Sequence, residues 1–187
     1  MLGKIFTEFL DLVEEQFGYE MVDKILIESN VPSQGSYTAV GAYSHEELFA
    51  LVIKLSESVN VPTKELMLIF GQVMFKRLVS GHPEILNAID DSFELLSHID
   101  DYIHVEVLKL YPNAQLPKFS FNRISDTEVV LTYQSSRPLA SFAQGLLMGC
   151  GEYFNEGFSI RREPQTSDSE TDVVFVINRA MKECEHA

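Results

Sequence analysis

Residues 129–137 read Val-Val-Leu-Thr-Tyr-Gln-Ser-Ser-Arg, and the polar end of this stretch holds the most informative pattern in the chain. Tyr133, Ser135 and Arg137 alternate, so on a β-strand running into its loop they face the same side. A phenol, a hydroxyl and a guanidinium then offer hydrogen-bond donors to one ligand, and the guanidinium fork suits carboxylate or phosphate oxygens. The stretch therefore predicts a strand whose end receives a ligand with acidic groups.

A histidine on an expected helix, His104, lies 29 residues before Tyr133. One protein nitrogen is a poor zinc site, but it suffices for haem, because the porphyrin supplies four equatorial ligands. Haem also carries acidic propionates, so the pair of features indicates this cofactor. A lone helical histidine is more often an ordinary boundary residue, and alternating polar residues often just form a solvated strand face, so a cofactor-free reading stays open. No multi-histidine site is expected from the remaining histidines, which are His45, His82, His98 and His186.

Composition limits the classes of protein to consider. A chain of 187 residues with 45% apolar and 22% charged residues suits one globular domain. The net charge of −14 disfavours nucleic acid and anionic membranes as partners and favours a basic protein. Acidic residues interrupt the first apolar stretch, and no other stretch is long enough to span a membrane, so we expect a cytoplasmic protein.

Helical periodicity covers the first two thirds of the chain. We expect a helix over 5–17 ended by Gly18, a second before Pro32, a loop over about 33–43, and a capping box of Ser44 and Glu47. Further helices are expected after a Thr63 cap, from Pro83, and as one long helix over about 90–111.

The pattern then changes to alternation. Strands are expected around Phe119 and Phe121, over 129–133, 158–162 and 173–177, with a helix over about 139–154 and a polar loop over 163–171. The fold class is therefore α+β: a helical subdomain over about 1–60, then a part over about 61–180 with a four-stranded antiparallel sheet and packed helices. The haem would lie buried between the two parts.

No catalytic motif is apparent. The chain has no Gly-x-Ser-x-Gly elbow, Walker loop, Gly-x-Gly-x-x-Gly turn or His-Glu-x-x-His helix, and the acid pairs at 90–91 and 100–101 are typical of solvated faces. We expect a regulatory protein and not an enzyme. Two alternatives are a haem-dependent peroxidase or oxygenase, which would need acid–base groups above the iron, and a cofactor-free acidic interaction module, which would be colourless.

With Pro117 thirteen residues after His104, the set His104, Pro117 and Tyr133-x-Ser135-x-Arg137 resembles the haem nitric oxide/oxygen binding (H-NOX) domain. That family is related to the haem domain of soluble guanylate cyclase. The resemblance covers about residues 1–180 and extends to three short segments, Gly3-Lys4-Ile5-Phe6, Phe70-Gly71-Gln72 and Tyr111-Pro112.

The resemblance implies a role for each site residue. His104 would be the proximal ligand of ferrous haem b, Pro117 would press the porphyrin out of plane, and the propionates would be held by Tyr133, Ser135 and Arg137. The distal wall would consist of Ile5, Phe9, Met74, Phe142 and Leu146. Oxygen-binding members carry a distal Tyr hydroxyl where this chain has Phe142. The resemblance therefore implies binding of NO, weaker binding of CO, and poor binding of oxygen.

The resemblance also implies a signalling mechanism. NO would weaken the bond between iron and His104, and its rupture would let the porphyrin flatten against Pro117 and shift the N-terminal helices. Bacterial relatives report to histidine kinases or diguanylate cyclases, so a partner of that kind is implied. Some relatives hold zinc near the C-terminal sheet, but this chain has only Cys150 and Cys184, so we expect no zinc.

Overall fold

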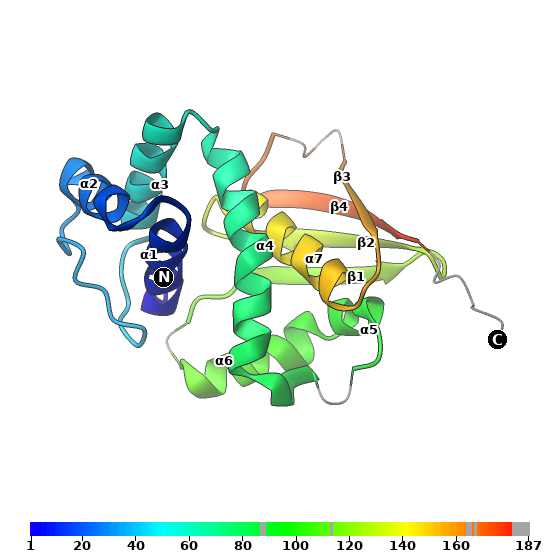
Figure 1. Ribbon diagram of the computed structural model, residues 1–187. Helices are drawn as coiled ribbons and strands as arrows, with labels where there is room; N and C mark the ends of the chain where they lie inside the picture. The colour runs from blue at the N-terminus through cyan, green and yellow to red at the C-terminus, as the bar shows by residue number, and fades with distance from the viewer. Residues whose placement is uncertain (87–88, 113, 164–165, 167, 181–187) are drawn as a thin grey trace, which may run out of the picture.

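The computed structural model describes residues 1–86, 89–112, 114–163, 166 and 168–180, and Cys184 and His186 lie outside this range. Figure 1 shows α1 to α3 grouped away from a sheet that α7 crosses. The elements are α1 Gly3–Phe17, α2 Tyr19–Ser29, α3 His45–Val59, α4 Thr63–Gly81, the 3₁₀ turn η1 Pro83–Leu86, α5 Ser92–Ser97, the π-helical turn η2 Ile99–Ile103, α6 His104–Leu110, β1 Lys118–Arg123, β2 Glu128–Gln134, α7 Ala140–Tyr153, β3 Phe158–Arg162 and β4 Asp172–Arg179.

The first helices agree with the prediction, but two of their expected caps are wrong. Gly18, with φ of 83°, separates α1 from α2, and Ser44 caps α3 by accepting from the Glu46 amide at 3.2 Å. Glu47 does not complete a capping box, because its buried carboxylate accepts from the Ser33 hydroxyl and, at 3.0 Å, from Tyr37. Pro62 and not Thr63 is the N-cap of α4.

The predicted long helix over 90–111 is instead three short pieces. Asp91 caps α5 by accepting from the Glu94 amide at 2.8 Å. The carbonyl of His98 then accepts from both the Tyr102 and the Ile103 amides, at 3.1 and 3.0 Å. The second of these bonds spans five residues, which makes the turn π-helical, and such turns are frequent at functional sites. The π turn η2 ends directly before His104.

The four strands form one antiparallel sheet in the order β1-β2-β4-β3, which confirms the α+β class. Burial alternates along β2, with Val129, Leu131 and Tyr133 on its buried side. Tyr133 pairs with Phe119 of β1 and with Val173 of β4, so it occupies an interior position of the sheet. Among the described helices, none is both long and apolar enough to cross a membrane.

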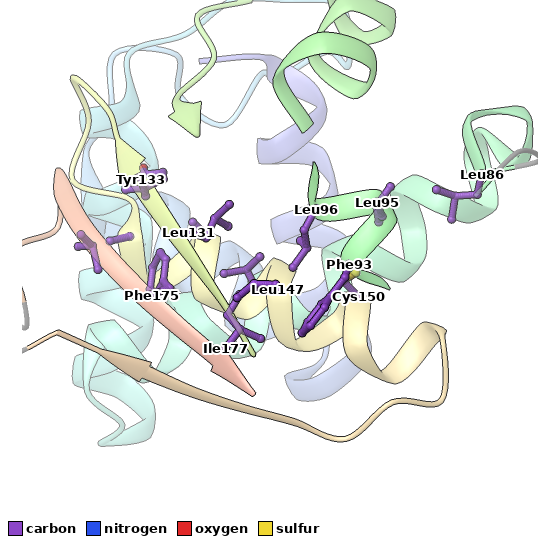
Figure 2. Close-up of a cluster of buried hydrophobic side chains, with 14 residues drawn as sticks. Leu86, Phe93, Leu95, Leu96, Leu131, Tyr133, Leu147, Cys150, Phe175 and Ile177 are labelled. Atoms are coloured by element: carbon purple, nitrogen blue, oxygen red, sulfur yellow. The ribbon is translucent and has the colours of Figure 1, made fainter. Parts of the chain in front are cut away.

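Two clusters of buried apolar side chains share helices α4 and α7. One joins the N-terminal helices to Phe70 and Met74 of α4. The other joins the sheet to α5 and α7, and Figure 2 shows Leu131, Phe175 and Ile177 of the strands beside Leu147 of α7. Because α7 contributes Phe142 and Leu146 to the first cluster and Leu147 to the second, it connects the two.

The crossing of α4 and α7 depends on glycine. A Cβ atom on Gly71 would lie 2.1 Å from the Phe142 carbonyl oxygen, and one on Gly145 would lie 2.0 Å from the Leu68 carbonyl oxygen. Real side chains do not approach backbone atoms so closely, so the two helix backbones are in direct contact. This contact fixes the distance between α4 and α7, and both helices line the cavity described below.

We predict that Gly145→Ala forces the two helices apart and lowers the free energy of unfolding by about 1–3 kcal/mol, as overpacking does elsewhere. Gly81→Ala is the matched control, because nothing lies within 4 Å of its added Cβ, and alanine suits a helix better than glycine. Urea titration monitored by circular dichroism measures both. Equal stability of the two variants would contradict the close contact.

Candidate functional site

A cavity of about 340 Å³ lies between the two apolar clusters, within the usual size range of small-molecule sites. The elements that line it are the start of α1, the C-terminal half of α4, the segment from α5 to α6, the loop before β1, the end of β2 and α7. The structure brings together here most residues singled out from the sequence: Ile5, His104, Pro117, Tyr133, Ser135, Arg137, Phe142 and Leu146.

His104 stands at this wall with one ring nitrogen already engaged. Its side chain is 16% exposed, and Nδ1 lies 2.9 Å from Oδ1 of Asp100. Burial lowers the pKa of His104 and outweighs the opposing effect of Asp100, so the imidazole is neutral at pH 7. Because an ionised carboxylate only accepts, the proton belongs on Nδ1 and the lone pair on Nε2. Nε2 of His104 can therefore donate its lone pair to a metal.

The polar end of the cavity is built on the loop after β2. Tyr133 is buried, and burial raises the pKa of its phenol, which stays a neutral donor. The Ser135 hydroxyl accepts from the Arg137 amide at 3.1 Å. The Arg137 guanidinium donates to the backbone and side-chain oxygens of Gln115, both neutral acceptors. Arg137 has no carboxylate partner among the described contacts, so its positive charge suits an acidic group of a guest.

Two residues expected in the distal wall do not line the cavity. Phe9 and Met74 are 2% and 0% exposed, and both belong to the cluster of the N-terminal helices. The Phe9 ring packs on Phe70 at 5.3 Å, and Phe70 packs on Phe142 at 5.1 Å. The Phe70 ring therefore lies between Phe9 and the wall residue Phe142. The apolar wall itself includes Ile5, Leu48, Leu139, Phe142 and Leu146.

Several residues that sequence reasoning missed also contribute to the site. Asp100 is exposed, as expected of a solvated face, but it also binds His104, and the oxygens of Gln115 accept from Arg137. Phe119 lines the cavity with its ring 5.9 Å from that of His104. The four-residue spacing of Asp100 and His104 was a usable signal, because it places both on one helical face. The position of Gln115 in a loop left no such signal.

Two further side chains could compete with His104 as iron ligands. His82, the residue after α4, lines the same cavity, as does the buried thiol of Cys150. Burial raises the pKa of Cys150, with a smaller contribution from Glu156, so the thiol stays protonated and is a poor ligand. In the part of the chain that the structure describes, no three His, Cys, Asp or Glu side chains gather as a metal site.

The residues present fit a metalloporphyrin. One neutral imidazole could supply a single axial donor, the walls are mostly apolar, and a phenol, a hydroxyl and a guanidinium among the lining groups could bind acidic substituents. An α+β fold around such a cavity suits a haem-binding domain. Residues 2–162 match the sequence model of the haem-NO-binding family, and the chain belongs to this family, also called H-NOX.

Solved structures agree over nearly the whole chain. An H-NOX protein from Shewanella woodyi, in its Fe(II)CO ligation state with IWP-051 bound, is 54% identical with a TM-score of 0.83, covering 100% of this chain and 98% of that one. The unliganded Fe(II) protein from K. algicida is 39% identical with a TM-score of 0.90, covering 97% of each chain. An S. oneidensis protein in the Fe(II)NO state is 28% identical with a TM-score of 0.88, covering 97% and 100%. No curated protein sequence matches the chain significantly.

We predict that Cys150 is inert in the folded protein, because its thiol is buried and its pKa is raised. In a Cys184→Ser background, it should react with Ellman's reagent on the order of a hundredfold more slowly than in guanidinium chloride. Absorbance at the thionitrobenzoate band follows the reaction. Rapid labelling of the native protein would show that the thiol is accessible and ionised.

Proposed function

We propose that this chain is a haem-based sensor of nitric oxide that binds haem b through His104, also binds CO, and holds oxygen poorly. When bound, the ferrous haem supplies the iron to which these gases attach. The observation that carries the proposal is the neutral imidazole of His104 at the wall of an apolar cavity that Arg137 also lines. Tyr133 and Ser135 would join Arg137 in holding the propionates, and Pro117 would contact the porphyrin face.

The apolar wall supports sensing over catalysis. Ile5, Phe142 and Leu146 offer neither a proton acceptor nor a donor, so this part of the cavity lacks the acid–base groups that a peroxidase or oxygenase needs. The same wall gives a bound oxygen molecule no hydrogen bond, whereas NO binds ferrous iron strongly without one. We infer a regulatory protein that is not an enzyme.

Signalling would start at His104. If iron no longer held the imidazole, α6 and the π turn before it would be held only by their contacts with the rest of the chain, and α6 would be able to shift. We propose that this shift moves the helical part, about residues 1–60, relative to the part over about 61–180. A cytoplasmic histidine kinase or diguanylate cyclase would read the change.

His104→Gly tests the proposed bond between His104 and the haem iron. We expect its haem affinity to fall more than about tenfold, which is ~1.4 kcal/mol, and to recover when free imidazole is added. His82→Gly is the control, because it removes another imidazole of the same cavity. Soret absorbance during haem titration measures both. Loss of haem from the His82 variant with retention by the His104 variant would overturn the proposal.

Phe142→Tyr tests the selectivity against oxygen. A hydrogen bond contributes about 0.5–1.5 kcal/mol net and more in a dry pocket, so oxygen should dissociate about tenfold more slowly. Phe142→Met alters the same wall without a hydroxyl and should cause no such slowing. Flash photolysis or stopped-flow spectroscopy gives the rates. A stable oxygen complex of the unaltered protein in aerobic buffer would contradict the proposed selectivity.

A further inference from the structure

The carboxylate of Asp100 bridges the helical segment and the sheet. Its Oδ1 lies 2.9 Å from Nδ1 of His104, and its Oδ2 accepts from the Phe119 amide at 2.9 Å. Phe119 belongs to β1, follows Pro117 by two residues, and packs its ring near that of His104. One side chain therefore ties the imidazole to the strand that begins beside Pro117.

Asp100 itself lies within the π turn η2. In that turn the His98 carbonyl is shared by two amides, an arrangement that is less regular than an α-helix and rarely continues beyond one turn. The bond from Asp100 to Phe119 fastens this turn to β1 from outside. The orientation of His104, the next residue after the turn, therefore depends on a contact that the helix alone does not provide.

We propose that Asp100 is the positioning residue of His104: it fixes the proton on Nδ1, directs Nε2 into the cavity, and retains the imidazole beside β1 after release from iron. The inference rests on the proposed function. A carboxylate behind a metal-binding histidine orients the ring and strengthens it as a donor, and its loss commonly costs 10–100-fold in metal affinity. Asp100 would thereby set the balance between the tethered and the released state.

The chain provides a matched control next to Asp100. Asp101 also accepts from a histidine on the same segment, with 3.2 Å between its Oδ1 and Nδ1 of His98. That pair lies at the surface, with side chains 46% and 69% exposed, and neither residue lines the cavity. Asp100→Asn and Asp101→Asn therefore change the net charge equally, but only the first change reaches His104.

The test compares the two variants as haem-loaded full chains. Asp100 uses one oxygen for His104 and the other for the Phe119 amide, and asparagine would replace one of these acceptors by an NH₂ donor that faces another N–H group. We expect Asp100→Asn to lower the iron–histidine stretching frequency in resonance Raman spectra and to release haem to excess apomyoglobin about tenfold faster. Asp101→Asn should match the unaltered protein in both measurements.

Two outcomes separate this inference from the proposed function. If the unaltered protein shows no iron–histidine band, the proposed function fails and this inference fails with it. If the band is present and the two variants behave alike, Asp100 has no positioning role, although the sensor proposal stands. Nitrogen-15 spectra of His104 without haem give a second readout. Nδ1 should carry the proton in the unaltered protein and in Asp101→Asn. A mixture of tautomers in the unaltered protein would overturn the inference.

Discussion

The site depends on keeping one imidazole neutral and correctly oriented at the edge of an apolar cavity. Burial makes the charged form of His104 costly, and the Asp100 carboxylate occupies the nitrogen that bears the proton. Neither effect is sufficient alone. Burial without Asp100 would leave the tautomer undefined, and Asp100 without burial would favour a protonated ring with no lone pair to donate.

The cavity lies where the two apolar clusters meet, so it is in contact with both parts of the protein. Helices α4 and α7 belong to both clusters and touch through Gly71 and Gly145. A guest in the cavity would contact the N-terminal helices through Ile5 and the sheet through Tyr133, since both residues line it. A change in the shape of the guest would therefore alter contacts with both parts of the protein, and this is the arrangement that a sensor requires.

The sequence alone predicted the regular elements well and the irregular ones poorly. Alternating burial located β2, and helical periodicity located α1 and α7 to within about two residues. The segment around His104 looked like one long helix, because apolar spacing does not reveal that the His98 carbonyl is shared. Glu47 was misread for a related reason: its partners, Ser33 and Tyr37, come from a loop that local patterns do not position.

The site shows the same division. Tyr133, Ser135 and Arg137 could be grouped from their alternation, and all three line the cavity. The resemblance, and not the spacing of apolar residues, placed Phe9 and Met74 in the distal wall, and both side chains lie in the buried cluster of the N-terminal helices. The roles of these residues toward haem are proposals that the variants described above address.

The bond from Asp100 to the Phe119 amide has a consequence for how copies of this protein meet. β1 lies at the margin of the sheet, and backbone amides on a margin can recruit a strand from another molecule. The carboxylate occupies one of these amides and places negative charge beside it. The residue that binds the imidazole thus also satisfies one edge amide that would otherwise be free to pair with a strand of another molecule.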